Sequence, residues 1–228
     1  MEPHKTGYGT NMRDFILGGQ DGLVNVLAVI LGVATATNDI RIILIAGLAA
    51  TFGESISMAA VAYTSTKAEE DFYKSELERE KREMKEMPEE ERREIHDIYH
   101  KKGFKGNLLN AIVNKITSDE KVWLETMMTE ELHLYKEEHK SAAKSAAIVG
   151  FAAILGSLIP LIPFLFYGVQ DGIIASMLIS TFFLFLVGAV KAKITIGSWV
   201  KSGIELAVIG MAAALVGFII GSILGVTV

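Results

Sequence analysis

Long apolar runs alternate with one extended polar block along this chain. A run of roughly 20 apolar residues can cross the hydrocarbon core of a bilayer as a helix. These runs are rich in Gly, Ala and branched aliphatic residues, as is typical of membrane helices that pack closely. Five spans are predicted, at approximately Asp14–Thr37, Arg41–Thr64, Ala142–Tyr167, Gly172–Val190 and Lys201–Val226.

A soluble helical protein is the alternative, but its helices would carry a polar stripe along one face. Ile173–Val190 contains no charged residue, and Gly203–Val226 contains a single one, Glu205. The pattern therefore predicts an all-α membrane protein with five transmembrane helices.

The polar block covers residues 65–140 and separates the second span from the third. Glu, Lys, Arg and Met dominate it, and these residues favour helix. Pro88 and the turn at Gly103 and Gly106 divide the block into three helices, and Ser118 with Asp119 offers an N-cap for the third. The third helix is expected to run directly into the third span. The expected helices are Ala68–Met87, Glu89–His100 and Ser118–Lys140, so the domains are 1–64 with spans 1–2, the helical domain 65–140, and 141–228 with spans 3–5.

Positive charge outside the spans predicts the orientation. Arg and Lys mark the cytoplasmic side of membrane proteins. Lys5, Arg13, the polar block, Lys191, Lys193 and Lys201 all fall on one side if the N-terminus is cytoplasmic and the C-terminus is outside. The short loops favour a prokaryotic cytoplasmic membrane, and an organellar membrane remains an alternative. The polar start and the length of the first apolar run indicate that this span is not a cleavable signal.

Composition excludes several classes of site. The chain has 22 Lys and Arg, 27 Asp and Glu, a net charge of −5 and no Cys. Without Cys there are no disulfides or thiolate metal sites. An acidic balance argues against nucleic-acid binding, which needs a basic face.

Ionisable residues inside the predicted spans are candidates for a transport path. Asp14 and Asp21 share a helix face, and Glu54 lies near the middle of the second span, at a depth similar to that of Asp21. A carboxylate in hydrocarbon costs at least a few kcal/mol, so it normally faces a pathway or a partner. The alternative is a protonated carboxyl group that bonds a neighbouring helix. Met58, one turn from Glu54, adds a thioether that favours softer first-row metals.

The polar block offers a second group of candidate ligands. Glu80 and Glu83 lie one helical turn apart, and Glu91 and Glu94 repeat the spacing after Pro88, so two antiparallel helices could bring four carboxylates together around a cation. The third helix offers further ligands. The alternative is a solvated, charged helix face. The candidate ligands on the third helix are Met127, Met128, Glu130, Glu131 and His133.

Several short motifs together resemble the vacuolar iron transporter family, which includes the nodulin-21-like proteins. The resemblance covers nearly the whole chain. It implies a dimer of five-helix protomers, a cytoplasmic metal-binding helical domain, and exchange of Fe²⁺ against H⁺. The motifs are Asp21-Gly-Leu-Val-Asn, Leu31-Gly-Val, Ala46-Gly-Leu-Ala, Ile56-Ser-Met-Ala and Pro160-Leu-Ile-Pro-Phe-Leu.

The resemblance also implies roles for single residues. Asp14, Asp21 and Met58 correspond to the translocation path at the dimer interface, and Glu54 lies two helical turns before the position at which many members carry an acidic residue. The ligands implied for the cytoplasmic domain are Glu80, Glu83, Glu91, Glu94, Met127, Met128 and Glu131. The chain departs from the family at Val61-Ala62, where many members have Gly-Glu, and at Glu205, where a basic residue is frequent.

The expected function is movement of Fe²⁺, with Mn²⁺, Zn²⁺ or Co²⁺ as further substrates, out of the cytoplasm in exchange for protons. We expect no enzyme activity and no permanently bound cofactor. Partners are the lipid bilayer and a second copy of the chain, joined along the first span at the close-packing Gly18 and Gly19. One alternative is a membrane-tethered ferritin-like oxidase, suggested by Glu130-x-x-His133, although such a site needs two Glu-x-x-His motifs. Another is a metal sensor or scaffold without transport.

Overall fold

The computed structural model describes residues 6–135, 141–194 and 197–225, and within these ranges it contains helices and no strand. The described chain divides into two compact units, one comprising residues 1–64 with 141–228 and the other residues 65–140. The helices are α1 (Thr6–Thr37), α2 (Ile40–Glu86), α3 (Pro88–Lys101), α4 (Gly106–Thr117), α5 (Glu120–Thr126), the π-helix η1 (Met127–Glu131), α6 (Ala142–Leu161), the 3₁₀-helix η2 (Ile162–Leu165), α7 (Val169–Ile194) and α8 (Trp199–Leu224).

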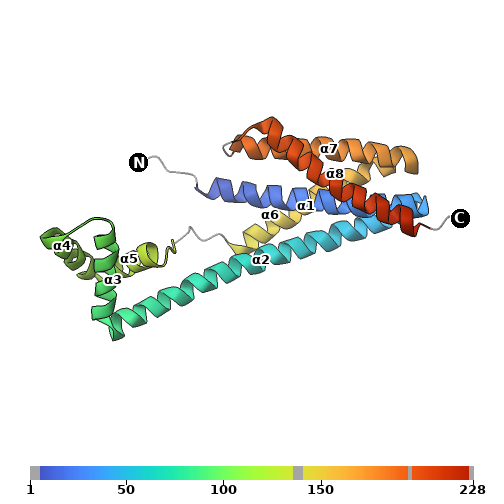
Figure 1. Cartoon of the computed structure of the whole chain (residues 1–228). Coiled ribbons are helices and arrows are strands. Elements are labelled where there is room, and N and C mark those ends of the chain that lie inside the picture. Colours follow the sequence, from blue (N-terminus) through green and yellow to red (C-terminus); the bar gives the residue numbers. More distant parts are fainter. Residues whose placement is uncertain (1–5, 136–140, 195–196, 226–228) are drawn as a thin grey trace. The chain divides into compact units, whose positions relative to one another are not determined.

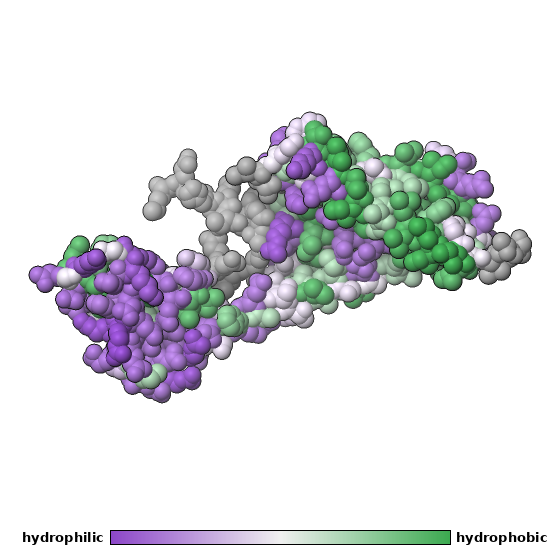
Figure 2. Space-filling model, in the orientation of Figure 1, coloured by the Kyte–Doolittle hydropathy of each residue, from purple (hydrophilic) through white to green (hydrophobic). Residues whose placement is uncertain are grey.

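Five helices among the described residues are long and apolar enough to cross a membrane, which confirms the predicted number of spans. Large apolar side chains are exposed on the surface of this unit, as on Ile45 (69%), Ile56 (70%) and Phe166 (77%). Figure 2 shows that hydrophobic residues dominate the unit's visible surface. Such a surface is stable only against lipid or another apolar partner, so the unit has the exterior of a multi-pass membrane protein.

Helix α1 forms the centre of the membrane unit and contacts α6, α7 and α8 (Figure 1). Its approach to α6 depends on glycine. A methyl group at Gly18 would overlap the carbonyl oxygen of Val149, and one at Gly156 would overlap the carbonyl oxygen of Gly19. The packing of Gly18 against α6 within one chain argues against its predicted contact with a second copy, whereas the predicted contact of Gly19, which is half-buried, stays a prediction.

One face of α2 packs within the membrane unit. Ile43, Gly47, Thr51 and Ser55 are buried at intervals of one turn. The α2 helix then continues without a break to Glu86, so the helix predicted to start at Ala68 is the second half of α2 and not a separate element. No Gly or Pro occurs between Glu54 and Met87 to end it.

The unit 65–140 has a small apolar core. Ile95 of α3, the α4 residues Leu109 and Val113, and Met127 of η1 pack together and are almost completely buried. Helix α4 is not among the predicted helices, because the sequence pattern assigns Gly106 to a turn. Gly106 is instead the first residue of the helix, with φ at +58°, a conformation that favours glycine.

The third predicted helix of this unit is shorter than expected. Asp119 caps α5 by accepting hydrogen bonds from the backbone N–H groups of Lys121 (2.9 Å) and Val122 (3.2 Å). The helix continues through η1 and ends at Glu131, so the prediction of helix at Leu132–Tyr135 is wrong. The rest of the predicted helix, 136–140, lies outside the described residues.

Candidate metal centre and membrane carboxylates

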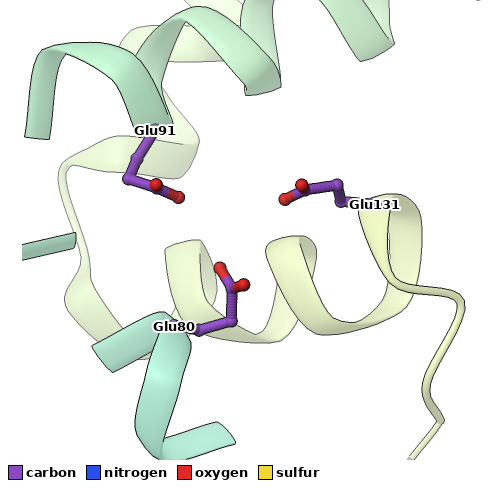
Figure 3. A group of neighbouring side chains, drawn as sticks. All are labelled: Glu80, Glu91 and Glu131. Atoms are coloured by element: carbon purple, nitrogen blue, oxygen red, sulfur yellow. The ribbon is translucent and has the colours of Figure 1, made fainter. Parts of the chain in front are cut away.

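Three glutamates from three helices converge within the unit 65–140. Glu80 lies on α2, Glu91 on α3 and Glu131 on η1, and one carboxylate oxygen from each lies within 4.8 Å of the others. Figure 3 shows the three carboxyl groups pointing toward a common point. Oxygens bound to one ion at about 2.0–2.2 Å can lie up to roughly 4.4 Å apart, so small side-chain movements allow one cation to bind all three. We call these three residues the glutamate cage.

Local structure explains how each glutamate reaches the cage. Pro88 occupies the first turn of α3, where its missing N–H costs nothing, and thereby starts the helix that carries Glu91. Glu131 ends the π-helix, in which the N–H of Leu132 donates to the carbonyl of Met127 at 3.2 Å. A π-turn inserts one extra residue, which changes the direction of the side chains that follow, and such turns are frequent at functional sites.

The cage is electrostatically strained without a cation. Burial, followed by repulsion from Glu94 and Glu80, raises the pKa of both Glu91 and Glu131 to about 7. Burial, followed by repulsion from Glu83, also raises the pKa of Glu80. One oxygen of each cage carboxylate is buried without a hydrogen-bond partner among the described residues. A buried carboxylate normally has a cation or donors around it, so this arrangement favours a bound cation.

Two further predicted ligands border the cage. Glu94 is exposed, and its carboxylate lies close enough to that of Glu131 to raise the pKa of Glu131 by repulsion. Glu83 is half-buried and pairs with the guanidinium of Arg79, whose Nε lies 3.4 Å from a Glu83 oxygen. Five of the predicted acidic ligands therefore lie in one cluster. Three of them, the residues of the glutamate cage, direct carboxylate oxygens toward a common position.

The two predicted methionine ligands lie differently. Met127 belongs to the apolar core with Ile95 and Val113, and this packing accounts for its complete burial. Met128 is also buried, at 1% exposure. Glu130 forms an ion pair with Lys102 and not with the cage.

Sequence reasoning missed the cations around the cage. Arg79 lies between Glu76, at 2.8 Å, and Glu80, at 3.6 Å. Lys102 holds Glu130, the residue before the cage ligand Glu131. The ion pairs of Arg79 could have been predicted, because Arg79 lies one helical turn from both Glu76 and Glu83. The pair of Lys102 and Glu130 could not, because these residues are far apart in the sequence.

The membrane unit contains a second acidic contact. The carboxyl groups of Asp21 on α1 and Glu54 on α2 lie close enough to interact electrostatically, and both residues are half-buried. Their proximity agrees with the similar depth predicted for the two residues. Met58 is also half-buried, one turn further along α2. This acidic pair with a thioether nearby could hold a cation or a proton.

Asp14 has a different environment. It is 6% exposed, and the hydroxyl of Ser145 on α6 donates to its carboxylate at 2.6 Å. This bond links α1 to α6 and supports a structural contribution from Asp14. The hydroxyl groups of Thr51 and Ser55 donate to carbonyls of their own helix, at 2.8 and 2.6 Å. Ala62 is buried and Glu205 is exposed.

Comparisons with known proteins agree on one family. A sequence model of the VIT family matches residues 12–222. The chain is 34% identical to vacuolar iron transporter 1 of Arabidopsis thaliana over 97% of its own length and 89% of that protein. It is 35% identical to vacuolar iron transporter 2 of Oryza sativa subsp. japonica over 95% of its own length and 88% of that protein. It is 30% identical to the vacuolar iron transporter of Plasmodium falciparum over 94% of its own length and 82% of that protein.

Proposed function

The chain belongs to the VIT family of membrane metal transporters, and we propose that it moves Fe²⁺, and also Mn²⁺, across a bilayer in exchange for protons. Relatives at 34–35% identity are named as iron transporters, which supports iron as a substrate. The observation that carries the proposal is the pairing of two acidic sites: the glutamate cage in one unit and Asp21 with Glu54 in the membrane unit.

Carboxylate chemistry supports these substrates. Carboxylate oxygens suit Mn²⁺ and Fe²⁺, whereas Cu⁺ would favour thiolates and thioethers, and the chain has no Cys. The cage can collect the ion, while Asp21 and Glu54 accept it inside the membrane. Since each carboxylate can hold either a metal ion or a proton, binding of one displaces the other, and this competition is the basis of exchange.

The positive charges outside the spans support a cytoplasmic N-terminus, a cytoplasmic unit 65–140 and an external C-terminus. In this orientation the metal ions would be moved out of the cytoplasm. The short loops support a prokaryotic cytoplasmic membrane, while the relatives are named for the vacuole.

A homodimer joined along α1 is also part of the proposal, through a face other than that of Gly18. Asn25 is exposed on α1, one turn beyond Asp21, with Leu17 (50% exposed) and Val29 (41%) along the same side. An amide facing hydrocarbon is costly unless a partner helix satisfies it. Oxidation of an Asn25→Cys variant should cross-link two copies, whereas Leu178→Cys on the exposed side of α7 should not.

The oxidase alternative receives no support from the site. Glu130 of the Glu130-x-x-His133 motif pairs with Lys102, and His133 is exposed. A di-iron site would need both residues to converge with further carboxylates.

Flux into proteoliposomes tests the proposal. Vesicles with an acidic interior should accumulate Mn²⁺, or Fe²⁺ under anaerobic conditions, and dissipating the pH gradient should stop the accumulation. The variant with Glu80, Glu91 and Glu131 all replaced by Gln should show a lower apparent affinity and retain flux at saturating metal. Protein-independent flux, or flux that ignores the pH gradient, would contradict the proposal.

A further inference from the structure

Two histidines lie one helical turn apart on α3, outside the glutamate cage. The rings of His96 and His100 are nearly parallel, with 5° between their planes and 6.1 Å between their centroids. His96 is half-buried and His100 is exposed. Residues four apart on a helix project in the same direction, so rotation of the two rings can bring one nitrogen from each onto a single ion.

The pair is separate from the cage. At 100° per residue, His96 lies about 140° and His100 about 180° around the helix from Glu91. Glu91 is buried toward the cage, whereas the side chain of His96 is 43% exposed and His100 is exposed. An ion bound by the histidines would therefore not share ligands with the glutamates.

A carboxylate orients one of the rings. Oδ1 of Asp97 lies 3.3 Å from Nδ1 of His96. This contact favours the tautomer in which Nδ1 carries the proton and donates to Asp97, and that tautomer leaves Nε2 as a free metal ligand. Histidines that bind metals in proteins commonly have such a carboxylate on the second ring nitrogen.

Two arginines precede the pair on α3: Arg93 is exposed on the side of the two histidines, whereas Arg92 is held elsewhere. Arg92 lies one turn before His96, but its guanidinium donates to Thr117 at 3.0 Å and also to Asn114, both on α4. Its charge is thus kept on the α4 side of the helix. The solvent beside the two rings can supply the remaining ligands as water.

We propose that His96 and His100 form a second metal site, which binds divalent ions that prefer imidazole, with Zn²⁺ as the representative ion. Imidazole favours Zn²⁺, Cu²⁺ and Ni²⁺ over the ions that prefer carboxylate oxygens, such as Mn²⁺. With two protein ligands the affinity is expected on the order of micromolar, weaker than a closed structural zinc site, which uses four. This site is independent of transport and of the cage.

Calorimetry with Zn²⁺ on the full-length protein tests the site. The cage is silenced by replacing Glu80, Glu91 and Glu131 with Gln, and one Zn²⁺ should still bind. His96→Gln and His100→Gln should each weaken that binding by at least about tenfold, because each removes half of the protein ligands. Asp97→Asn should weaken it several-fold. His133→Gln, which changes an exposed histidine outside the pair, is the matched control and should have no effect.

Histidine-selective NMR of the parent protein, with the cage intact, gives a second reading that does not depend on folding of the cage variant. Sub-stoichiometric Zn²⁺ should shift the ring signals of His96 and His100 before those of the other three histidines. Zinc affinity unchanged in the His96→Gln and His100→Gln variants, an equal loss in His133→Gln, or ring signals that do not respond would overturn the proposal.

Discussion

Replacement of Glu91 by Gln should stabilise the metal-free unit 65–140 at neutral pH and flatten its dependence on pH. In the folded protein burial and the neighbouring carboxylates raise the pKa of Glu91 from 4.5 to about 7. Between pH 4.5 and about pH 7, the folded unit therefore retains a proton on Glu91 that the unfolded chain has released. Since stability falls with rising pH wherever the folded state holds more protons, it should decrease from about pH 4.5 to pH 7 and remain low above.

The size of the effect follows from the shift. A rise from 4.5 to about 7 corresponds to about 3 kcal/mol of unfolding free energy lost above pH 7. The raised pKa of Glu131 includes repulsion from Glu91, so the two losses overlap and do not add in full. The amide of Gln removes the charge but leaves buried N–H groups that need acceptors, which reduces the gain. A net stabilisation of about 1–3 kcal/mol at pH 8 is expected.

Urea unfolding of the full-length protein in detergent can measure this difference. The chain has two tryptophans, and Trp123 packs against the core of the unit. A Trp199→Phe background leaves Trp123 as the fluorescent reporter and retains a ring against Phe185. Glu78→Gln is the matched control, because Glu78 is exposed on α2 two residues from Glu80.

Metal should reverse the loss of stability in the parent. At a Mn²⁺ concentration of 100 times its dissociation constant, the gain is about 2.7 kcal/mol. The gain should be smaller in Glu91→Gln, which has lost one charged ligand. Parallel pH profiles for the parent and Glu91→Gln between pH 4.5 and pH 7 would refute the reasoning, since the carboxyl group of Glu91 would then titrate alike in the folded and unfolded chain.

Three further predictions concern the membrane unit. Asp21→Asn and Glu54→Gln should each abolish pH-driven Mn²⁺ flux in proteoliposomes, because an amide can neither neutralise the cation nor exchange a proton; near-parental flux in both would make the pair structural. Met58→Leu should leave the fold intact, lower Fe²⁺ flux and weaken discrimination against Ca²⁺ in a competition assay, since only the thioether is lost. Gly156→Val should destabilise the protein by about 3 kcal/mol or more in thermal unfolding, because the added carbons overlap the Gly19 carbonyl, whereas Gly168→Ala, with open space around it, should not.

The number of membrane spans could be predicted from the sequence because each span is a local property. A run of about 20 apolar residues must satisfy its backbone within one helix when lipid surrounds it, whatever its neighbours are. The sequence was a weaker guide to where each helix begins and ends. Helix α2 continues to Glu86 because nothing in its sequence stops it, and α4 was missed although its buried residues Leu109, Val113 and Ile116 follow helical spacing.

The candidate ligands could be identified by residue type and by one-turn spacing, which is also local. Glu80, Glu83, Glu91 and Glu94 were found in this way, and Asp21 and Glu54 were found because charge is costly in hydrocarbon. Sequence could not show which oxygens converge. That choice depends on a π-turn at Met127–Glu131 and on the packing of α3 against α4 and η1, which move Glu131 toward Glu80 and Glu91 and leave Glu94 at the edge.

The sequence by itself therefore determined the helical class, the number of spans, the polar block and the types of ligand, since each depends on hydrophobicity or charge along a single helix. The tertiary structure alone decided the partner of each group: Asp14 with Ser145, Glu130 with Lys102, and Met127 within the apolar core. It also showed that Gly18 and Gly19 face α6 of the same chain. These contacts join residues far apart in the sequence, and their energy depends on backbone approach and side-chain direction, which are set only when the helices pack.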